Sequence, residues 1–287
     1  MSTFLPFKID LSGKVAVVTG GGGVLCSGFA KALAASGASV AVLDLRQEAA
    51  QKVADEIAAE GGKAVGIAAN VLEKDSLEAA RDAVAKAFGT CDILLNGAGG
   101  NNPKGTTTKE YLFPEDLKEK AEGVATFFDL DVSGVRFVFD LNFLGTLLPT
   151  QVFAADMAGK PGAVILNVSS MNAFRPLTKI PAYSAAKAAV SNFTQWLAVH
   201  FAPVGIRVNA IAPGFFVTDQ NRALLMNHDG SLTPRSEKIL SHTPMNRFGT
   251  PEDLTGALLW LVDDKASGFV NGVVVPVDGG FAAYSGV

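Results

Sequence analysis

Tyr183 and Lys187 stand four residues apart in a segment of sequence AYSAAK, and Ser170 precedes the tyrosine by thirteen residues. Residues 182–201 have a helical pattern, which places the phenol and the ammonium group on one face. A phenol ordinarily titrates near pH ~10, and a fixed ammonium beside it favours the phenolate. The spacing therefore predicts a tyrosine that exchanges a proton with a substrate. The alternative is an amphipathic helix with one exposed lysine.

A second chemical signal lies near the start of the chain. The apolar run Val15–Thr19 leads into four consecutive glycines, Gly20–Gly23, and then into a helical pattern. Glycines at such a junction let backbone N–H groups approach a pyrophosphate at a helix N-terminus, although a flexible turn is the alternative. Asp44 follows the next apolar run, 24 residues after Gly20. A carboxylate there is suited to bind the hydroxyls of an adenosine ribose, unless it is only a solvated charge.

The composition is that of a water-soluble enzyme domain. The chain has 287 residues, is 48% hydrophobic and carries a net charge of −4, so no basic field favours nucleic acid or an anionic membrane. Cys26 and Cys91 form no CxxC pair, and the three histidines have no ligand spacing, so we expect no metal site. The N-terminus lacks a signal-peptide pattern, and no apolar run reaches the ~18 residues of a membrane span. A cytoplasmic protein is the expectation.

Short apolar runs alternate with helical patterns along the whole chain. We predict helices that end near Leu33, span 47–60, 76–88, 135–157 and 182–201, and begin at Thr250. Strands that are apolar throughout and alternate with helices indicate a parallel sheet covered on both faces. The fold class predicted is α/β, a doubly wound Rossmann-like sheet of about seven strands. The predicted strands are Val15–Thr19, Ser39–Leu43, Ala64–Ala69, Ile93–Leu95, Ala163–Val168, Val208–Ile211 and Val273–Val277.

No linker divides the chain, so residues 1–287 are predicted to form one domain. Its dinucleotide-binding half covers about 12–135, and its catalytic and substrate-binding half covers about 136–287. Two stretches, 100–134 and 215–249, are polar and irregular. Both follow predicted strand ends, which is the side where open α/β sheets bind ligands.

Together these motifs resemble those of the short-chain dehydrogenase/reductase family over nearly the full chain. The glycine segment begins at Thr19-Gly20, and the family's Asn-Asn-Ala-Gly stands as Asn96-Gly97-Ala98-Gly99. Asn142, Ser170, Tyr183 and Lys187 match the family's catalytic positions, and its Pro-Gly-x-x-x-Thr spans 213–218. The usual Gly-Ile-Gly is replaced by Val24-Leu25-Cys26. The family's Asp after the third strand is Asn70 here, an amide that can still bond adenine.

The resemblance implies a hydride-transferring enzyme that uses NAD, with NADP less favoured. It implies that Tyr183 moves the proton, Lys187 lowers its pKa and holds the nicotinamide ribose, and Ser170 binds the carbonyl. Asn142 is expected to hold a water in a proton relay. The expected cofactor-binding residues are Gly20, Gly22, Gly23, Val24, Leu25, Asp44, Asn70, Val71, Asn96, Ala98, Gly99, Tyr183, Lys187, Pro213, Gly214, Phe216 and Thr218.

Several loops narrow the resemblance to the D-mannonate oxidoreductase (fructuronate reductase) branch of that family. They contain amides suited to sugar hydroxyls and arginines suited to a carboxylate. The expected substrate-binding residues are Asn101, Asn172, Arg175 and Arg222, with Asn102, Gln220 and Asn221 on the same loops. The reaction implied interconverts D-fructuronate and D-mannonate.

Three questions stay open at this point. Another sugar acid or polyol, as in a gluconate 5-dehydrogenase, is an alternative substrate class. A non-catalytic dinucleotide-binding sensor is the alternative from another class, but the full set of four catalytic residues argues against it. The resemblance also implies a homo-oligomer, a dimer or homotetramer that uses the helices at 135–157 and 182–201.

Overall fold

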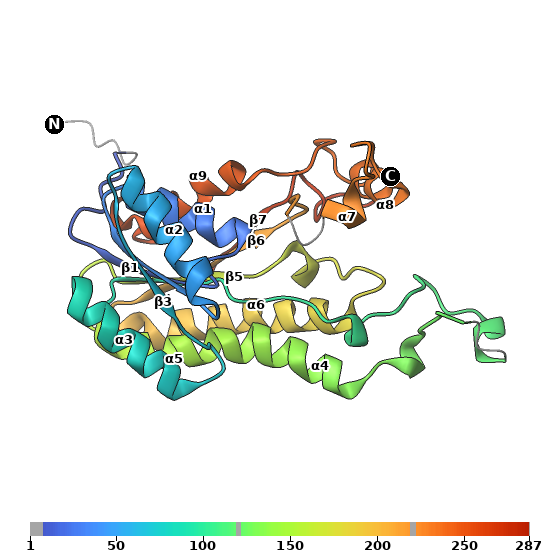
Figure 1. Ribbon diagram of the computed structural model, residues 1–287, viewed down its shortest axis with the longest axis horizontal. Helices are drawn as coiled ribbons and strands as arrows, with labels where there is room; N and C mark the ends of the chain where they lie inside the picture. Colours follow the sequence, from blue (N-terminus) through green and yellow to red (C-terminus); the bar gives the residue numbers. More distant parts are fainter. Residues whose placement is uncertain (1–7, 119–121, 219–221, 287) are drawn as a thin grey trace.

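The computed structural model describes residues 8–118, 122–218 and 222–286. Seven parallel strands form one sheet in the order β3-β2-β1-β4-β5-β6-β7 (Figure 1). The order reverses between β1 and β4, so the carboxyl ends of the strands open a crevice at that point. The strands are β1 Val15–Thr19, β2 Ser39–Asp44, β3 Lys63–Ala68, β4 Ile93–Asn96, β5 Val164–Val168, β6 Arg207–Pro213 and β7 Val274–Val277.

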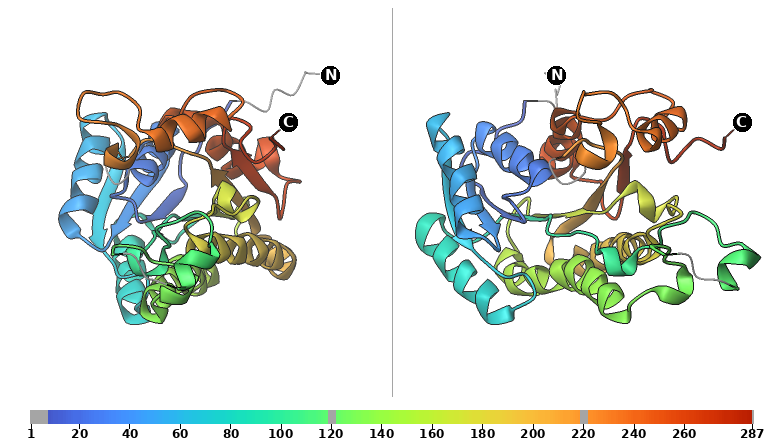
Figure 2. Two further views of the ribbon diagram at one scale, coloured as in Figure 1. Left: turned by 90° about the vertical axis from the view of Figure 1, so that its right-hand side faces the viewer. Right: turned by 45° about the vertical axis from the view of Figure 1, so that its right-hand side comes forward.

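Helices cover both faces of this sheet, as Figures 1 and 2 show. On one face, α1 (Val24–Ala35), α2 (Gln47–Ala59) and α9 (Pro251–Val262) contribute to one apolar core. On the other, α3 (Lys74–Phe88), α5 (Gly145–Met157) and α6 (Pro181–Phe201) contribute to a second. The strands are apolar throughout because both of their faces are buried. The predicted fold class is therefore confirmed, with strand bounds shifted by one or two residues.

The long helix predicted over 135–157 has a break in its regular winding. It consists of α4 (Val132–Phe139), a π-helical turn at Asp140–Leu144 and α5, which contains Pro149. The whole span of 26 residues passes a length and composition test for a membrane helix, although half of its most apolar window is buried inside the fold. Its packing on α3, α6 and β4 is that of a core helix.

The two irregular stretches both begin at the carboxyl ends of strands and differ in how far they extend from the sheet. We call residues 106–131 the arm; its described part extends away from the body in Figure 1 and in the right view of Figure 2. Thr108 closes its base by donating its backbone N–H to the Ala125 carbonyl oxygen at 2.9 Å. The second stretch folds into α7 (Arg222–Leu225) and α8 (Pro234–Ser241). A short α10 (Asp264–Ser267) follows α9, which begins, as predicted, after Thr250.

Two glycine-to-alanine changes should shift stability in opposite directions. A Cβ at Gly66 in β3 would lie 2.5 Å from the Gln51 backbone nitrogen, whereas a Cβ at Gly256 in α9 meets nothing within 4 Å. Gly66→Ala should lower the free energy of unfolding by about 1–3 kcal/mol through overpacking. Gly256→Ala should raise it by about 0.5–1 kcal/mol because alanine is the better helix former. Urea denaturation of both variants measures this, and equal midpoints would contradict the packing at Gly66.

Candidate active site

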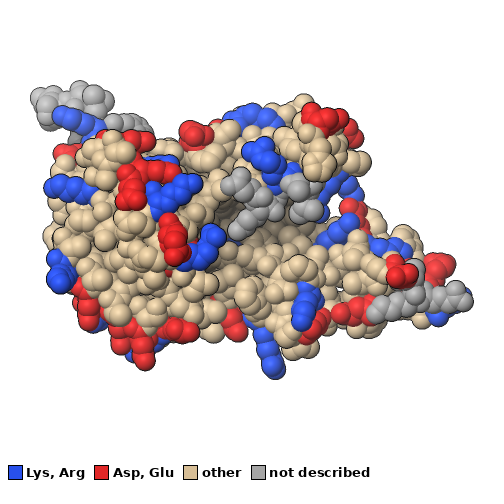
Figure 3. Space-filling view, viewed as in Figure 1, with Lys and Arg blue, Asp and Glu red and all other residues tan. Residues whose placement is uncertain are grey.

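A cleft of about 890 Å³ opens at the carboxyl ends of the central strands. The space-filling view shows the hollow near the centre of the molecule (Figure 3). Residues from the glycine segment, from the ends of β2, β4, β5 and β6, and from the start of α6 line it. The expected residues among them are Gly20, Gly22, Gly23, Val24, Leu25, Asp44, Asn70, Val71, Ala98, Gly99, Asn101, Ser170, Tyr183, Lys187, Pro213, Gly214, Phe216 and Thr218.

Ser170 and Tyr183 meet on the wall of this cleft. Ser170 ends the extended segment after β5, and its Oγ accepts the backbone N–H of Asn172 at 3.3 Å. Tyr183 stands on the first turn of α6, where Pro181 starts the helix without needing an N–H donor. Burial raises the pKa of the Tyr183 phenol, and the nearby Ser170 side chain opposes that rise.

Lys187 is buried one turn further along α6, beneath the tyrosine. Its Nζ donates to the Val168 carbonyl oxygen at 2.8 Å and lies 5.8 Å from the centre of the Tyr183 ring. A Cβ at Gly99 would come within 3.1 Å of this Nζ, so the glycine leaves the ammonium room at the cleft. Burial lowers the pKa of the Lys187 ammonium to about 8.

The electrostatics of this pair differ from the sequence expectation. We expected the ammonium to lower the pKa of the phenol, yet the pKa of Tyr183 is raised. The physical reason is that Lys187 is buried and Tyr183 is partly buried, and loss of hydration disfavours the charged form of each group. The ammonium is also directed at a backbone carbonyl and is positioned over the ring. The contact that does act to lower the pKa of the Tyr183 phenol is the hydrogen bond with the Ser170 side chain.

Asn142 is held in the π-helical turn below the cleft. Its Nδ2 donates to the carbonyl oxygens of Gly100 and Val138, both at 2.7 Å, and its Oδ1 accepts the Gly100 N–H at 3.3 Å. Thr146 Oγ1 donates to the Asn142 carbonyl oxygen at 2.9 Å. The side chain therefore ties the helix to the segment after β4. Asn142 does not itself line the cleft.

The glycine segment and Asp44 form one cradle. Asp44 accepts the N–H of Gly22 on Oδ2 and the N–H of Arg46 on Oδ1, both at 3.1 Å. A Cβ at Gly22 would lie 2.9 Å from Asp44 Oδ2. Gly20 has a φ of +64°, and a Cβ there would lie 2.9 Å from the Ala98 backbone nitrogen. The glycines thus let the backbone reach the cleft floor next to a carboxylate.

Cys26 takes the place of the family's last glycine and packs against β4. Its Sγ donates to the Gly97 carbonyl oxygen at 3.7 Å, and a Cβ at Gly97 would lie 2.2 Å from that sulfur. Burial raises the pKa of the Cys26 thiol to about 12, so the group stays protonated. Helix α1 still packs closely against the end of β4, because Gly97 has no side chain at the point where Cys26 meets it.

Asn96 does not line the cleft, although we expected it to contact the cofactor. It is the buried last residue of β4, and its Nδ2 donates to Thr150 Oγ1 of α5 at 3.0 Å and to Asn167 Oδ1 of β5 at 2.9 Å. Asn167 Nδ2 in turn donates to Thr194 Oγ1 at 2.9 Å. This polar seam joins α5 to α6 and was missed by sequence reasoning. Its signal was an asparagine at the same register in two otherwise apolar strands.

Of the four expected substrate residues, the structure places only Asn101 on the wall of the cleft. Asn101 donates its Nδ2 to Thr106 Oγ1 at 3.2 Å. Asn172 is buried away from the cleft wall, and its Oδ1 has no hydrogen-bond partner among the described residues. Arg175 is exposed and donates its Nε to the Ala282 carbonyl oxygen at 3.0 Å. Arg222 is exposed at the start of α7, and neither arginine lines the cleft. Gln220 and Asn221 lie outside the described residues.

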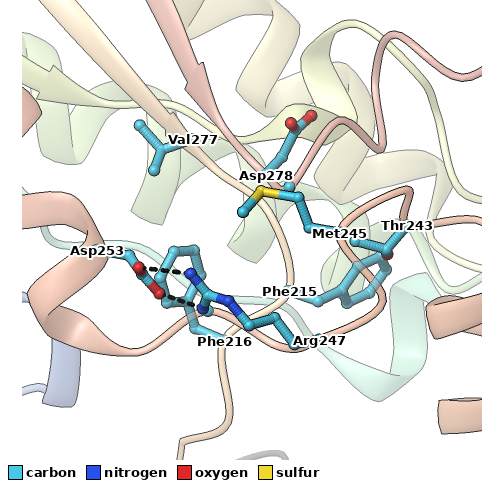
Figure 4. A pocket seen from close by; sticks show the side chains of 10 residues that line it. Phe215, Phe216, Thr243, Met245, Arg247, Asp253, Val277 and Asp278 are labelled. Carbon is cyan, nitrogen blue, oxygen red and sulfur yellow. Dashed lines mark hydrogen bonds and ion pairs between the residues drawn. The ribbon is translucent and has the colours of Figure 1, made fainter.

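A smaller hollow of about 150 Å³ lies behind Phe216. Phe216 lines both this hollow and the cleft. Figure 4 shows Arg247 at this hollow, pointing to Asp253 with two parallel contacts of 2.6 and 2.8 Å. A Cβ at Gly249 would meet the Phe216 ring at 2.4 Å. The ion pair and the glycine thus support the Phe216 segment from behind.

Comparisons with known proteins identify the family to which this chain is similar. A profile of the family described as short chain dehydrogenase matches residues 14–228. An uncharacterized oxidoreductase from Haemophilus influenzae is 62% identical over 278 residues, 97% of this chain and 96% of the relative. An uncharacterized oxidoreductase named UxuB from Bacillus subtilis is 53% identical over 283 residues, 99% of this chain and 100% of the relative. The crystal structure of a proposed D-mannonate oxidoreductase from Haemophilus influenzae with bound NAD matches with TM-score 0.92 and 62% identity. That match covers 97% of this chain and 98% of the other.

The buried ammonium should give the protein a specific pH dependence of stability. On folding, the pKa of Lys187 falls from 10.5 to about 8. Between these values the unfolded chain binds more protons, so the free energy of unfolding rises with pH. Relative to Lys187→Met, the wild type should gain up to ~1.4 kcal/mol per pH unit in that window. Urea denaturation of both proteins at several pH values measures the difference, and parallel profiles would show that Lys187 is not buried as a cation.

Proposed function

The chain belongs to the short-chain dehydrogenase family, and on that premise we propose that it is an NAD-dependent oxidoreductase acting on a sugar acid. The proposed reaction interconverts a keto-uronate and a hexonate, D-fructuronate and D-mannonate being the favoured pair. The observation that carries the proposal is the meeting of Ser170, Tyr183 and buried Lys187 on the wall of one cleft.

The groups of this chain supply the proton chemistry of the proposed reaction. Tyr183 donates its phenolic proton to the substrate oxygen during reduction and takes it back during oxidation. Because burial keeps this phenol protonated, the group is in the donor form before reduction. Ser170 donates a hydrogen bond to the same oxygen as negative charge develops. The Lys187 ammonium stabilises the phenolate that remains, and Asn142 fixes the floor of the cleft behind it.

The cleft fits a nicotinamide dinucleotide. The backbone at Gly20 and Gly22 approaches the cleft without side chains, as a pyrophosphate requires. Asp44 stands beside these glycines, where a carboxylate binds ribose hydroxyls and repels a 2′-phosphate. A dinucleotide bound there supplies or accepts the hydride. The bound NAD of the Haemophilus influenzae structure supports this cofactor for the present chain.

Two observations support a sugar acid as substrate. Asn101 lines the same cleft as Ser170, and its amide group suits a sugar hydroxyl. The D-mannonate oxidoreductase assignment of the Haemophilus influenzae structure points the same way.

A panel of keto-uronates and hexonates with NADH or NAD tests the proposal. D-fructuronate with NADH should give the highest kcat/KM. The rate is measured from the loss of absorbance of the reduced nicotinamide. Tyr183→Phe is the matched control, because it removes only the hydroxyl. This variant should lose about 10²–10⁴-fold in kcat and keep its NADH affinity within a few fold. More than a tenth of wild-type turnover in the variant would remove Tyr183 from the mechanism, and a preference for an uncharged ketone would contradict the sugar acid.

Asp44 should set the preference between the two dinucleotides. A carboxylate at the end of β2 would repel the 2′-phosphate of NADP by like charge, so Asp44→Ala should raise kcat/KM with NADPH relative to NADH about tenfold or more. Arg46, which follows closely, is available to meet that phosphate once the carboxylate is gone. The ratio of the two kcat/KM values in wild type and variant is the measurement. A wild-type enzyme that already prefers NADPH would overturn this role of Asp44.

A further inference from the structure

The wall of the cleft at the end of β6 is held from outside by a loop that is distant in the sequence. Residues 215–218 follow β6, and Phe215, Phe216 and Thr218 line the cleft. Phe216 pairs with Gly249 in a parallel β-bridge, and the Gly249 N–H donates to the Phe215 carbonyl oxygen at 2.9 Å. The loop before α9 therefore fixes the backbone of this wall.

Arg247 holds the peptide group through which this contact is made. Its Nη1 donates to the Phe248 carbonyl oxygen at 3.1 Å. That oxygen belongs to the same peptide group as the Gly249 N–H, so Arg247 binds one side of the group and Phe215 binds the other. Hydrogen bonds that are linked in this way polarise and strengthen one another.

The guanidinium is itself fixed by Asp253 on the first turn of α9. Its Nη1 and Nη2 lie 2.6 and 2.8 Å from the two carboxylate oxygens, as drawn in Figure 4. Asp253 Oδ2 also accepts the backbone N–H of Thr250 at 2.8 Å. We call Arg247, Asp253 and the Phe248–Gly249 peptide group the clasp. The clasp connects the N-terminus of α9 to the wall of the cleft.

The clasp lies at the surface, where an ion pair adds little to stability. The side chains of Arg247 and Asp253 are 50% and 31% exposed. Solvent screens such a pair, but two parallel bonds between a guanidinium and a carboxylate still fix the relative position of the two groups. The hydrogen bonds from Arg247 hold the pKa of the Asp253 carboxyl well below its usual range, so the pair stays charged at neutral pH. The clasp is therefore suited to set a position rather than to hold the fold together.

The hollow behind Phe216 makes the clasp important for this wall. The Phe216 side chain is 4% exposed and lines both the cleft and the hollow of about 150 Å³. Protein interiors contain few voids larger than a water molecule, and close packing is what usually fixes a side chain. A ring beside a hollow has fewer packing contacts on that side. Hydrogen bonds to the backbone then have a larger part in defining where the segment lies.

The wall stands beside the end of the cleft where the reacting groups meet. β6 is the neighbour of β5, and the Ser169 N–H donates to the Ile211 carbonyl oxygen at 2.8 Å. Ser170 follows directly, so the wall after β6 lies next to it. Asp44 ends β2, and β1, β4 and β5 lie between β2 and β6 in the sheet. A dinucleotide with its adenosine ribose at Asp44 and its reactive ring at Ser170 has the nicotinamide beside this wall.

We propose that Arg247 is a positioning residue for the nicotinamide half of the bound dinucleotide. Through Asp253 and the Phe248–Gly249 peptide group it fixes the Phe216 segment, against which that half of the cofactor lies. The inference rests on the proposed function in one respect, which is the placement of the dinucleotide in the cleft. It does not depend on the identity of the sugar acid.

Two ligands separate the halves of the cofactor in one experiment. ADP-ribose has the adenosine, pyrophosphate and second ribose of NADH but lacks the nicotinamide ring. Arg247→Met, which removes every donor of the clasp side chain, should weaken NADH binding about tenfold, or ~1.4 kcal/mol. Its affinity for ADP-ribose should stay that of the wild type. Calorimetric titration measures both, and the fluorescence of NADH at saturation should shift toward that of the free cofactor in the variant.

Two conservative variants keep the test valid if Arg247→Met folds poorly. Asp253→Asn keeps an acceptor for the Thr250 N–H and loses the charge, whereas Arg247→Lys keeps the charge but not the two parallel bonds. Each should show the same selective loss for NADH, smaller than in Arg247→Met. Arg81→Met is the matched control, because Arg81 on α3 also forms a surface ion pair, with Asp82, away from the cleft. It should bind both ligands as the wild type does.

Unchanged NADH binding in all three variants of the clasp would overturn the proposal. An equal loss of NADH and ADP-ribose binding would overturn it as well, since the effect would then come from a general disturbance of the cleft. A wild type that binds NADH but reduces none of the keto-uronates would instead overturn the proposed function and leave the role of Arg247 standing.

Discussion

The buried ammonium of Lys187 is the group on which the rest of the site depends. A lysine is seldom fully buried, because its charge loses hydration that the interior must replace. Here the Val168 carbonyl oxygen accepts a hydrogen bond from it, and Gly99 leaves space toward the cleft. This arrangement requires the end of β5, the start of α6 and the segment after β4 to lie at fixed positions. The sheet order brings these three together at the point where the strand sequence reverses.

Much of the fold could be predicted from the sequence, and the reason is periodicity. Continuous apolar runs such as Val15–Thr19 are buried on both sides, and only a covered parallel sheet provides that environment. The grouping of Ser170, Tyr183 and Lys187 in one cleft could also be predicted, since they come from one strand end and one helix face. Bounds shifted where caps decide them: α3 begins at Lys74, before the first apolar position of its pattern.

What could not be predicted depends on contacts between distant segments. The π-helical turn at Asn142 follows from the bonds of that side chain to Gly100 and Val138, which the local pattern does not contain. Asn96 was assigned to the cofactor because it belongs to a recognised motif, but its side chain is bonded to Asn167 on the neighbouring strand and to Thr150 on α5. The pKa of Tyr183 was expected to fall because its neighbour was known, whereas the degree of burial was not. The ion pair between Lys238 of α8 and Glu110 of the arm likewise has no signal in local periodicity.

The arm described above has a consequence for how such an enzyme can change over evolutionary time. Tyr111, Phe127 and Phe128 are each about two-thirds exposed, so they add little to the packed interior. Replacing or reshaping this segment therefore costs the fold little, because the two apolar cores on the faces of the sheet keep their contacts. A lineage can vary the sequence and length of the arm at small risk to folding, while the sheet and the cleft at its strand ends stay in place.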